Sequence, residues 1–325
     1  MSDNDHLPLI SIALCVYNGE RFLVEQLDSI LNQSHSHLEI VAVDDCSVDS
    51  SWHILNEYKR RYPCFRIYQN ESNLGHTKNF EKALSLCNGE FIALCDQDDI
   101  WHYDKLKIQL ANITTHQLIY HDSAFMDHYG NLINKKMSDV INLYSGDNPN
   151  VFLFLNCVSG HSCFFRKALL DVILPFHPNH FHDHWIAYVA ANIGTVHYIS
   201  ECLVNYRQHP DSSTDILNKR KILDRHYHEN RDIKKLEKEL NWIQHCSKFK
   251  YNRNNCLAND LSRLLEHRLK SYISIKYARL IYNHFDFLYF TQKKRKSKRN
   301  AFIYRQIWGL KSKLLWSQIF GKSRS

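Results

Sequence analysis

The chain has 325 residues, 44% of them hydrophobic, so it can bury the core of one large domain or of two smaller ones. No stretch reaches the roughly 18 apolar residues of a spanning helix, and no basic, then apolar leader opens the sequence. Both features disfavour a membrane-spanning chain, and we expect the protein to stay on the cytoplasmic side. The ten cysteines form no CxxC pair, and Cys15, Cys95 and Cys157 lie in apolar runs, which indicates buried thiols in a reducing compartment.

The charge is divided unevenly along the chain. Residues 1–218 carry 14 Lys and Arg against 26 Asp and Glu, a net charge of −12, whereas residues 219–325 carry 27 against 8, a net charge of +19; together they give the overall +7. An acidic first part favours a site that uses cations. A basic last part favours a phosphate-rich partner, either a membrane surface or a nucleic acid.

The first part of the chain alternates between apolar runs of strand length and amphipathic runs of helix length. Strands are expected at residues 9–16, 38–43, 65–68 and 91–95, with helices at 21–33, 51–62, 77–87 and 103–116. This alternation predicts right-handed β-α-β units, and therefore an α/β fold with a Rossmann-like, mostly parallel sheet and flanking helices.

The pattern is less regular from residue 118 onward. We expect a strand at 118–121, a turn at 127–131, a loop at 142–150, a helix that opens near 180 and ends near 192, and two strands at 196–200 and 203–206. Beyond residue 215 the sequence becomes basic and helical, with breaks near 250–255 and 293–300. We therefore place a catalytic domain at residues 1–215 and a basic α-helical C-terminal region at residues 216–325.

Three carboxylates, Asp96, Asp98 and Asp99, follow the expected strand at 91–95. Carboxylates packed this closely raise one another's pKa unless a cation or hydrogen-bond donors compensate, which favours a divalent metal with oxygen ligands. The alternative is a solvated acidic turn that begins the next helix.

Polar residues also follow the first two strands, namely Tyr17 and Asn18, then Asp44 and Asp45. The carboxyl ends of parallel strands meet at one edge of the sheet, where α/β proteins bind ligands, so three strand ends agree on one site. The loop after the first strand lacks GxGxxG and GxxxxGK[ST], which disfavours dinucleotide and P-loop cradles. A diphosphate bound here would need a metal.

Over about residues 8–215 the sequence resembles the family 2 glycosyltransferases of GT-A fold. The resemblance depends on ordered motifs, which read VYNGERFL, VDDCSVDSS, NLGHTKNF, DQDDIW, HDHWIA and YRQH. Together they resemble the rhamnosyltransferase-like bacterial enzymes that build surface polysaccharides. This resemblance implies the GT-A fold and sugar transfer from a nucleotide-linked donor.

The resemblance implies a role for individual residues. Asp99 matches the metal-binding aspartate and Asp98 the residue near the donor ribose, with His209 as a third metal ligand or diphosphate contact; Mn²⁺ or Mg²⁺ suits such ligands. For His209 the alternative is a histidine in a loop, and for Arg207 it is an ion pair at the surface. The expected donor-binding residues are Tyr17, Asn18, Glu20, Asp44, Asp45, Asp96, Asp98 and Arg207, with Tyr17 and Asp45 at the nucleotide base.

Inverting transfer needs one base to take the proton of the acceptor hydroxyl, and Asp183 matches the position of that base. A helix N-terminus stabilises an ionised carboxylate there. His182 and His184 are alternative bases, because imidazole titrates near neutrality. On the acceptor side we place His161, His182 and Trp101; for Trp101 the alternative is packing beneath the site.

The last residues predict a basic helix with an apolar stripe. Trp308 and Trp316 lie on or beside this stripe, which an anionic membrane surface would bind; its members are Ile303, Ile307, Leu310, Leu314, Leu315 and Ile319. The alternatives are a helical cap on the catalytic domain and a contact in a homo-oligomer.

We therefore expect an inverting, metal-dependent glycosyltransferase at the inner face of the cell membrane, as a peripheral protein. It would move a sugar from a dTDP- or UDP-linked donor to a lipid-linked or polysaccharide acceptor in the synthesis of O-antigen, capsule or lipooligosaccharide. One alternative is a sugar nucleotidyltransferase of related fold, but the expected Gly- and Arg-rich loop after the first strand is missing. The other is a non-catalytic scaffold that binds a membrane or nucleic acid; we expect no nucleic acid partner.

Overall fold

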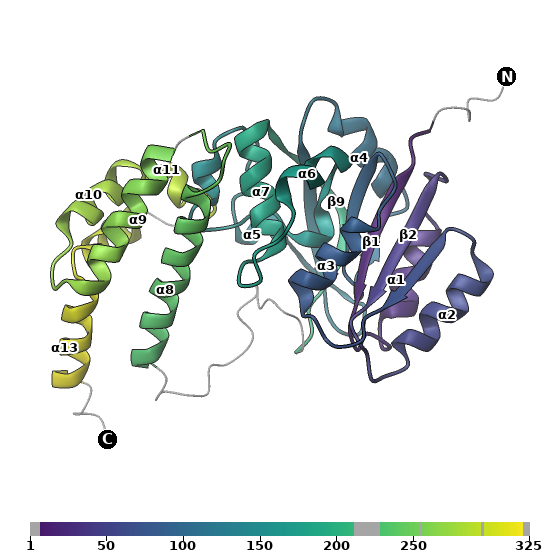
Figure 1. Ribbon diagram of the computed structural model, residues 1–325, viewed down its shortest axis with the longest axis horizontal. Helices are drawn as coiled ribbons and strands as arrows, with labels where there is room; N and C mark the ends of the chain where they lie inside the picture. Colours follow the sequence, from purple (N-terminus) through teal and green to yellow (C-terminus); the bar gives the residue numbers. More distant parts are fainter. Residues whose placement is uncertain (1–6, 211–227, 254, 294–295, 321–325) are drawn as a thin grey trace. The chain divides into compact units, whose positions relative to one another are not determined.

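The computed structural model describes residues 7–210, 228–253, 255–293 and 296–320 (Figure 1). The chain divides into two compact units. Residues 1–147 and 157–215 form the first, and residues 148–156 and 216–325 form the second. The boundary predicted after residue 215 lies outside the described residues.

The first unit is built on a mixed sheet. Its strands are β1 (Ile10–Val16), β2 (Leu38–Asp44), β3 (Phe65–Gln69), β4 (Phe91–Cys95), β5 (Ile100–Trp101), β6 (Leu118–Met126), β7 (Leu132–Lys136), β8 (Phe164–Arg166) and β9 (Val196–Arg207). They follow the spatial order β3-β2-β1-β4-β8-β6-β9-β5, with β7 paired to β6. The strands β1 to β4 are parallel to one another, so the expected α/β sheet is confirmed in this half; on its other side β4 pairs with β8 in the antiparallel direction.

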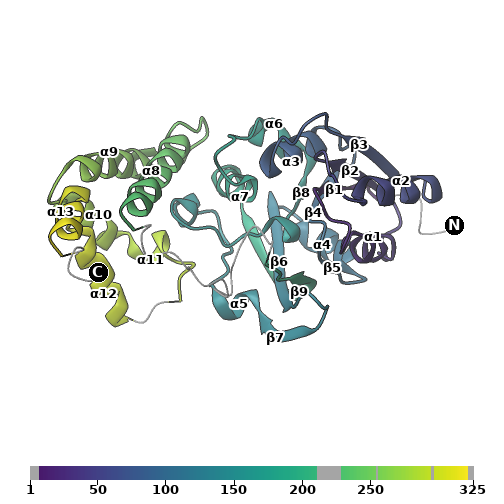
Figure 2. The same ribbon diagram turned by 90° about the horizontal axis from the view of Figure 1, so that it is seen from below.

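The helices of this unit lie in the connections between the strands. They are α1 (Leu23–Leu31), α2 (Ser51–Arg61), α3 (His76–Ser85), α4 (Lys105–Ile113), α5 (Met137–Val140), α6 (Leu170–Ile173) and α7 (His182–Ile193). The chain moves outward from β1 to β3 and then returns to β4. Because such crossovers are right-handed, α3 covers the opposite face of the sheet from α1, as Figure 2 shows.

The strands of this sheet are the core of the unit. Every residue of β1 and β4 is buried, as expected of apolar runs covered on both faces. All ten cysteines lie in described residues and are free thiols, and Cys15, Cys95 and Cys157 are buried as expected. Gly75, which precedes α3, has φ +81°, a conformation that side chains other than glycine rarely adopt.

The second half of the sheet differs from the expected pattern in two respects. The two strands expected at 196–200 and 203–206 are one strand, β9, and its register with β6 shifts near His121 and Asp122. Glu201 is exposed at this irregularity, and its charge interrupted the apolar pattern in the sequence. The short strand expected at 118–121 continues to Met126 as β6. Both differences arise because a bulge breaks the alternation of side chains without ending the strand.

The second unit is helical in its described residues. It contains a 3₁₀ turn (Pro149–Phe152), α8 (His228–Ser247), α9 (Asn255–Lys270), α10 (Ile275–Asn283), α11 (Phe285–Leu288), α12 (Lys296–Gln306) and α13 (Leu310–Phe320). The helices α8 and α9 lie side by side (Figure 1) and bury Ile243, Leu261 and Leu265. Among the described helices, none combines the length and apolar character required to cross a bilayer.

The single apolar helix expected through residues 303–319 is wrong, because α12 ends at Gln306 and α13 begins at Leu310. The break coincides with Gly309, where a Cβ atom would collide with the backbone of Ser271. The chain therefore turns at this point to let two backbones approach closely.

Candidate active site

A cavity of about 640 Å³ opens at the carboxyl ends of β1, β2 and β4. This is the edge of the sheet where the sequence placed a ligand site. The cavity is lined by Cys15, Val16, Tyr17, Asn18, Gly19, Arg21, Phe22, Asp45, Asn73, Gly75, His76, Asn79, Asp96, Gln97, Asp98, Tyr206 and His209.

The loop that follows β4 is joined to the loop that follows β1 through the side chain of Gln97. The Gln97 Oε1 atom accepts a hydrogen bond from Tyr17 N at 2.8 Å, and its Nε2 atom donates to Tyr17 O at 3.0 Å. This pair fixes the backbone of Tyr17, whose ring is 47% exposed at the cavity. The sequence analysis missed Gln97, although it lies within the DQDD motif.

Asp98 and His209 form a pair that faces the cavity. The His209 Nε2 and Asp98 Oδ2 atoms are 2.8 Å apart, and the two side chains are 11% and 17% exposed. The His209 ring packs against Phe22, with 5.1 Å between ring centroids. A carboxylate oxygen and an imidazole nitrogen that converge at an open cavity are suitable ligands for a divalent metal.

Asp99 lies behind this pair and is fully buried. Its Oδ1 atom accepts a hydrogen bond from Arg207 N at 2.9 Å, and its own N–H donates to Gln26 Oε1 at 3.0 Å. The Oδ2 atom has no hydrogen-bond partner. Burial, followed by the nearby charges of Asp98 and Asp96, raises the pKa of Asp99 well above its usual range.

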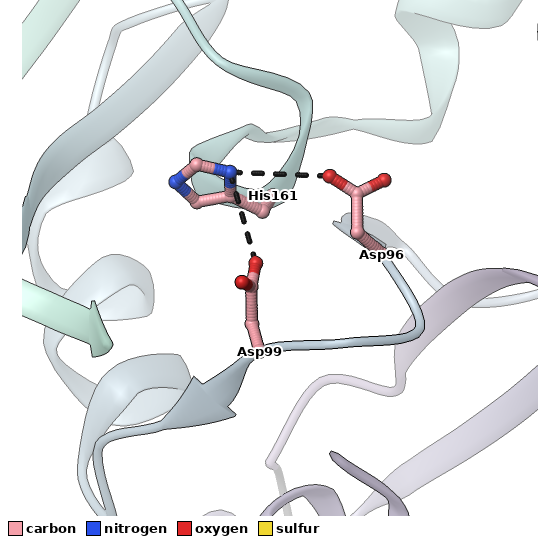
Figure 3. A group of neighbouring side chains, drawn as sticks. All are labelled: Asp96, Asp99 and His161. Carbon is pink, nitrogen blue, oxygen red and sulfur yellow. Dashed lines mark ion pairs between the residues drawn. The ribbon is translucent and has the colours of Figure 1, made fainter. Parts of the chain in front are cut away.

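A second group of possible metal ligands joins Asp96, Asp99 and His161, whose ligand atoms all lie within 4.8 Å of one another. The His161 Nδ1 atom lies 3.9 Å from Asp96 Oδ2 and 3.8 Å from Asp99 Oδ2. Dashed lines mark these two contacts in Figure 3. Burial lowers the pKa of His161 to about 4, so its ring is neutral and able to coordinate. Asp99 and His161 are not among the residues that line the cavity described above.

Arg207 contacts the loop that follows β4 and carries Asp96, Asp98 and Asp99. Its side chain is 1% exposed; Nε donates to Asp98 O at 2.8 Å, Nη2 donates to Glu25 Oε2 at 2.6 Å, and the guanidinium lies 4.5 Å from the Phe22 ring centroid. Together these contacts connect the loop after β4 to α1 and to Phe22, the residue before it. Arg207 is not among the described residues that line the cavity. Its expected contact with the donor phosphate therefore stays a prediction.

We expect Arg207→Ala to lower the free energy of unfolding by about 3 kcal/mol, because it leaves the partly buried carbonyl of Asp98 without its charged donor. It should also weaken metal-dependent donor binding about tenfold, since Asp98 loses its support. Glu25→Gln is the matched control, because Glu25 is 55% exposed and its ion pair contributes less than about 1 kcal/mol. Denaturant titration and donor titration measure both effects, and equal losses for the two variants would contradict this assignment.

Asp45 is positioned at the base of the cavity by the loop before α3. Its carboxylate accepts from Asn70 Nδ2 at 2.6 Å, Leu74 N at 2.8 Å and Gly75 N at 2.9 Å. The side chain is 2% exposed and lines the cavity. Three donors fix its orientation, so this carboxylate is rigid and can accept one further hydrogen bond from a ligand.

Three other residues expected to bind the donor make contacts between loops. Asp44 is fully buried and accepts from Ser47 and from Gln69, which closes the turn after β2. Asn18 and Glu20 accept from backbone N–H groups of that same turn, at Val48 and Ser50 respectively. Asn18 also lines the cavity. Their direct contact with a donor stays a prediction.

Asp183 occupies the first turn of α7 and is half-buried. Burial raises its pKa to about 6, although the hydrogen bond from His184 N at 2.6 Å and the nearby His76 act in the opposite direction. A carboxylate with this pKa is ionised at neutral pH and becomes protonated under mildly acidic conditions. These are the properties required of a general base.

The three residues expected on the acceptor side are all buried, with exposures of 1% for His161, 2% for His182 and 4% for Trp101. The His182 ring stacks on Phe80, and burial lowers the pKa of His182 to about 3. Lys105 Nζ lies 3.3 Å from the Trp101 ring centroid, a contact that agrees with the alternative of Trp101 packing beneath the site. Contact of these residues with an acceptor stays a prediction.

His76 is a cavity residue that the sequence analysis did not single out. Its Nε2 atom lies 3.8 Å from Asp96 Oδ1. Burial would lower the pKa of His76, but Asp96 outweighs burial and raises it; the pKa of Asp96, which burial would raise, is lowered in turn by His76. The signal was present in the NLGHTKNF motif, which places His76 at the first position of α3.

Comparison with known proteins agrees with this architecture. TuaG from Bacillus subtilis (strain 168), described as a teichuronic acid biosynthesis glycosyltransferase, is 37% identical over 103 residues, 32% of this chain and 41% of that protein. The alignment thus spans less than half of TuaG. An uncharacterized glycosyltransferase from Haemophilus influenzae is 24% identical over 253 residues, 72% of this chain and 74% of that protein.

Among solved structures, residues 1–349 of S. aureus TarS in complex with UDP-GlcNAc superpose with a TM-score of 0.56 at 16% identity, covering 87% of this chain and 82% of that one. This likeness confirms the GT-A fold. The model of glycosyl transferase family 2 matches residues 11–174, just over half of the chain. The rhamnosyltransferase-like subgroup stays a prediction, whereas the sheet, its carboxyl-end cavity and the family model agree: the chain belongs to glycosyl transferase family 2.

Proposed function

We propose that the protein is an inverting, metal-dependent glycosyltransferase that uses a uracil or thymine nucleoside-diphosphate sugar. The open cavity at the carboxyl ends of β1, β2 and β4 is the observation that carries this proposal, because it brings Tyr17, Asp45, Asp98 and His209 together. Tyr17 offers an exposed ring for stacking on a base. Asp45 offers a fixed acceptor for the N3–H group that uracil and thymine share.

The metal would be held at the cavity by Asp98 and His209, with the donor phosphates as further ligands. Metal sites of nucleotide enzymes commonly use one or two protein carboxylates together with substrate phosphates. The imidazole nitrogen favours Mn²⁺ over Mg²⁺, which prefers oxygen. When bound, the ion would offset the negative charge that develops on the leaving nucleoside diphosphate.

Asp99, the expected metal-binding aspartate, belongs to the buried group with Asp96 and His161. Its Oδ2 atom is buried without a hydrogen-bond partner, which suits an ion or a water as ligand. We favour Asp98 and His209 for the donor metal, because both reach the cavity where the diphosphate would lie. Substituting Asp98 or His209, and separately Asp99 or His161, distinguishes a metal at the cavity from a metal in the buried group.

Asp183 would take the proton from the acceptor hydroxyl as that oxygen attacks the anomeric carbon and the nucleoside diphosphate leaves. A single displacement of this kind inverts the configuration of the sugar. The acceptor would be a lipid-linked or polysaccharide glycan of the cell surface, as the similarity to TuaG supports.

The test is a screen of UDP- and dTDP-sugars for donor hydrolysis and for transfer, with Mn²⁺, Mg²⁺ or EDTA. We expect turnover of at least one such donor, dependence on the metal, and inversion of anomeric configuration by NMR. Turnover of purine-linked donors alone would contradict the base assignment. A product of retained configuration would contradict the single displacement.

We expect Tyr17→Ala to raise the KM for the donor about tenfold with little change in kcat, because it removes a stacking surface of roughly 1–3 kcal/mol for a bound base. Tyr129→Ala is the matched control, since Tyr129 is 75% exposed and is not a lining residue of the cavity. Steady-state kinetics with varied donor measure the difference. A fall in kcat at unchanged KM would contradict the assignment.

We also propose that the basic helical region binds an anionic membrane surface and holds the enzyme at the inner face of the cell membrane. Residues 219–325 carry a net charge of +19, which supports an anionic partner. Trp308 and Trp316 are 40% and 63% exposed, as membrane-interface aromatics would be.

A further inference from the structure

Two turns of the second unit are fixed to each other. Residues 271–274 join α9 to α10, and residues 307–309 join α12 to α13. Ile273 and Trp308 form an antiparallel bridge, and Gly309 N donates to Tyr272 O at 2.8 Å. Because the contact is made by backbone atoms, the side chains of the two turns keep a fixed arrangement.

These turns expose a group of large apolar side chains, which we name the exposed edge: Tyr272, Ile273, Ile275 and Trp308. Their exposures are 56%, 53%, 63% and 40% respectively. Single exposed apolar residues are ordinary, but a group on adjoining turns marks a binding surface. Aliphatic and aromatic side chains gathered in this way favour an apolar environment such as the boundary between lipid head groups and acyl chains.

A cavity of about 380 Å³ adjoins the exposed edge. It is lined by Arg263, Leu264, His267, Ile273, Ser274, Ile275 and Lys276. Its basic members come from α9 and from the first turn of α10, while its aliphatic members belong partly to the exposed edge. Arg263 also pairs with Asp260 at 2.8 Å, but both side chains are exposed, so this pair competes weakly with another anion. The cavity therefore combines cationic and apolar walls.

The surrounding sequence is strongly basic. Residues 255–320 carry 14 Lys and Arg against three Asp and Glu. Lys311 Nζ lies 5.7 Å from the Tyr272 ring centroid, which places one more cation beside the exposed edge. This charge complements an anionic surface. Burial of the aliphatic side chains in lipid adds favourable free energy of binding. Nucleic acid binds by charge and base stacking, so it offers no such gain for aliphatic side chains.

We propose that the exposed edge inserts into an anionic phospholipid bilayer and that the adjoining cavity receives the phosphate of a lipid head group. This inference deepens the membrane association proposed above and rests on it, but not on the sugar-transfer chemistry. It assigns the inserting residues to the turn 271–274, to Ile275 at the start of α10 and to Trp308, rather than to the apolar stripe of one continuous C-terminal helix.

The test is binding of the full chain to vesicles of phosphatidylcholine with 30% phosphatidylglycerol, compared with phosphatidylcholine alone. We expect the double variant Ile273→Ser/Ile275→Ser to lower the partition coefficient by tenfold or more, about the effect of losing two inserted aliphatic side chains. Lys276→Ala should lower it about fivefold on the anionic vesicles. Tyr251→Ser and Lys235→Ala are matched controls, exposed in the same unit but remote in sequence from both turns.

Acyl chains brominated near the head group provide an independent readout. Quenching of tryptophan fluorescence should occur on anionic vesicles and should be lost in Trp308→Phe. Persistence of that quenching in Trp308→Phe, with its loss in Trp316→Phe, would overturn the proposal in favour of α13. Equal losses in Lys276→Ala and Lys235→Ala, with none in the double isoleucine variant, would overturn it in favour of diffuse charge attraction.

Two further measurements separate this inference from the proposed enzyme. Donor hydrolysis in the absence of vesicles should be unchanged in the isoleucine and Lys276 variants. A chain that turns over no nucleotide sugar but binds vesicles as described would refute the proposed function and support the inference. A chain that turns over donor but binds neither type of vesicle would refute the inference and the membrane association on which it rests, and would leave the proposed sugar transfer standing. Binding of inorganic phosphate without vesicle binding would likewise refute it.

Discussion

Replacing Asp183 by Asn is expected to lower kcat for sugar transfer by roughly 10³, the middle of the range for loss of a general base. Asn has nearly the same shape and can still accept the hydrogen bond from His184 N, but it cannot take a proton. Donor binding should change less than twofold, because Asp183 is not among the described lining residues of the cavity. Rapid-quench transfer assays at saturating donor and acceptor measure the loss.

The pH dependence of the same variant tests the role of the carboxylate directly. Burial raises the pKa of Asp183 to about 6, and the base must be ionised to act. The wild-type kcat should therefore fall tenfold for each pH unit below about 6 and level off above it. The remaining activity of Asp183→Asn should lack this acidic limb. If His184→Ala removed the limb and Asp183→Asn retained it, the base would be the histidine.

Asp183→Asn should raise the free energy of unfolding, although it lowers the activity. The pKa of Asp183 rises from 3.8 in the unfolded chain to about 6 in the folded one, so ionisation above pH 6 destabilises the fold. The penalty is absent below pH 3.8, grows up to about 6 and is constant above. Asp183→Asn should therefore be more stable by about 3 kcal/mol at pH 7.5, and the gain should shrink at pH 5. A variant less stable than wild type at both pH values would contradict this.

The first half of the fold could be predicted from the sequence because its strands are short, mostly apolar runs. The residues of β1 and β4 are all buried, and the only polar residue within these two strands is Ser11. The location of the site followed from the same logic, since parallel strands place their ends at one edge. The second half was less predictable, because the irregularity of β9 near Glu201 resembles the end of a strand.

Which of the site's carboxylates reach the cavity and which are buried could not be predicted. Asp98 and Asp99 are adjacent in sequence, yet Asp98 reaches the cavity while Asp99 is buried against Arg207 N. Arg207 comes from a strand more than a hundred residues later. Spacing along the chain does not report which of two neighbouring side chains a distant strand will cover, so only the three-dimensional contacts distinguish them.

The C-terminal helices illustrate a different limit. Helical periodicity continued through residues 303–319 in the sequence, but the chain turns at Gly309, because a distant turn packs against it. Local periodicity detects an amphipathic helix and cannot detect a tertiary contact that interrupts it. The exposed apolar surface consequently lies partly on a turn that showed no pattern of its own.

Removal of the metal should slow transfer by a route distinct from loss of the base. We expect EDTA to lower the transfer rate by roughly 10³ or more, with recovery on addition of Mn²⁺, because a diphosphate leaving group needs its charge offset. Asp98→Asn and His209→Ala should lower the rate similarly at limiting Mn²⁺, with partial recovery in His209→Ala at high Mn²⁺. Mn²⁺ should support a higher rate than Mg²⁺ in the wild type, and His209→Ala should reduce that preference, since the nitrogen ligand is lost.

The arrangement of the ligands determines how these variants separate. Asp98 and His209 have their facing atoms 2.8 Å apart at the cavity, whereas Asp99 and His161 lie behind it. Titration with Mn²⁺ in the presence of donor nucleotide, followed by electron paramagnetic resonance, should therefore show weakened binding in Asp98→Asn and His209→Ala but little change in His161→Ala. Weakened binding in Asp99→Asn and His161→Ala, with none in Asp98→Asn, would place the ion in the buried group. Because this readout does not require turnover, it holds even for variants too slow to assay.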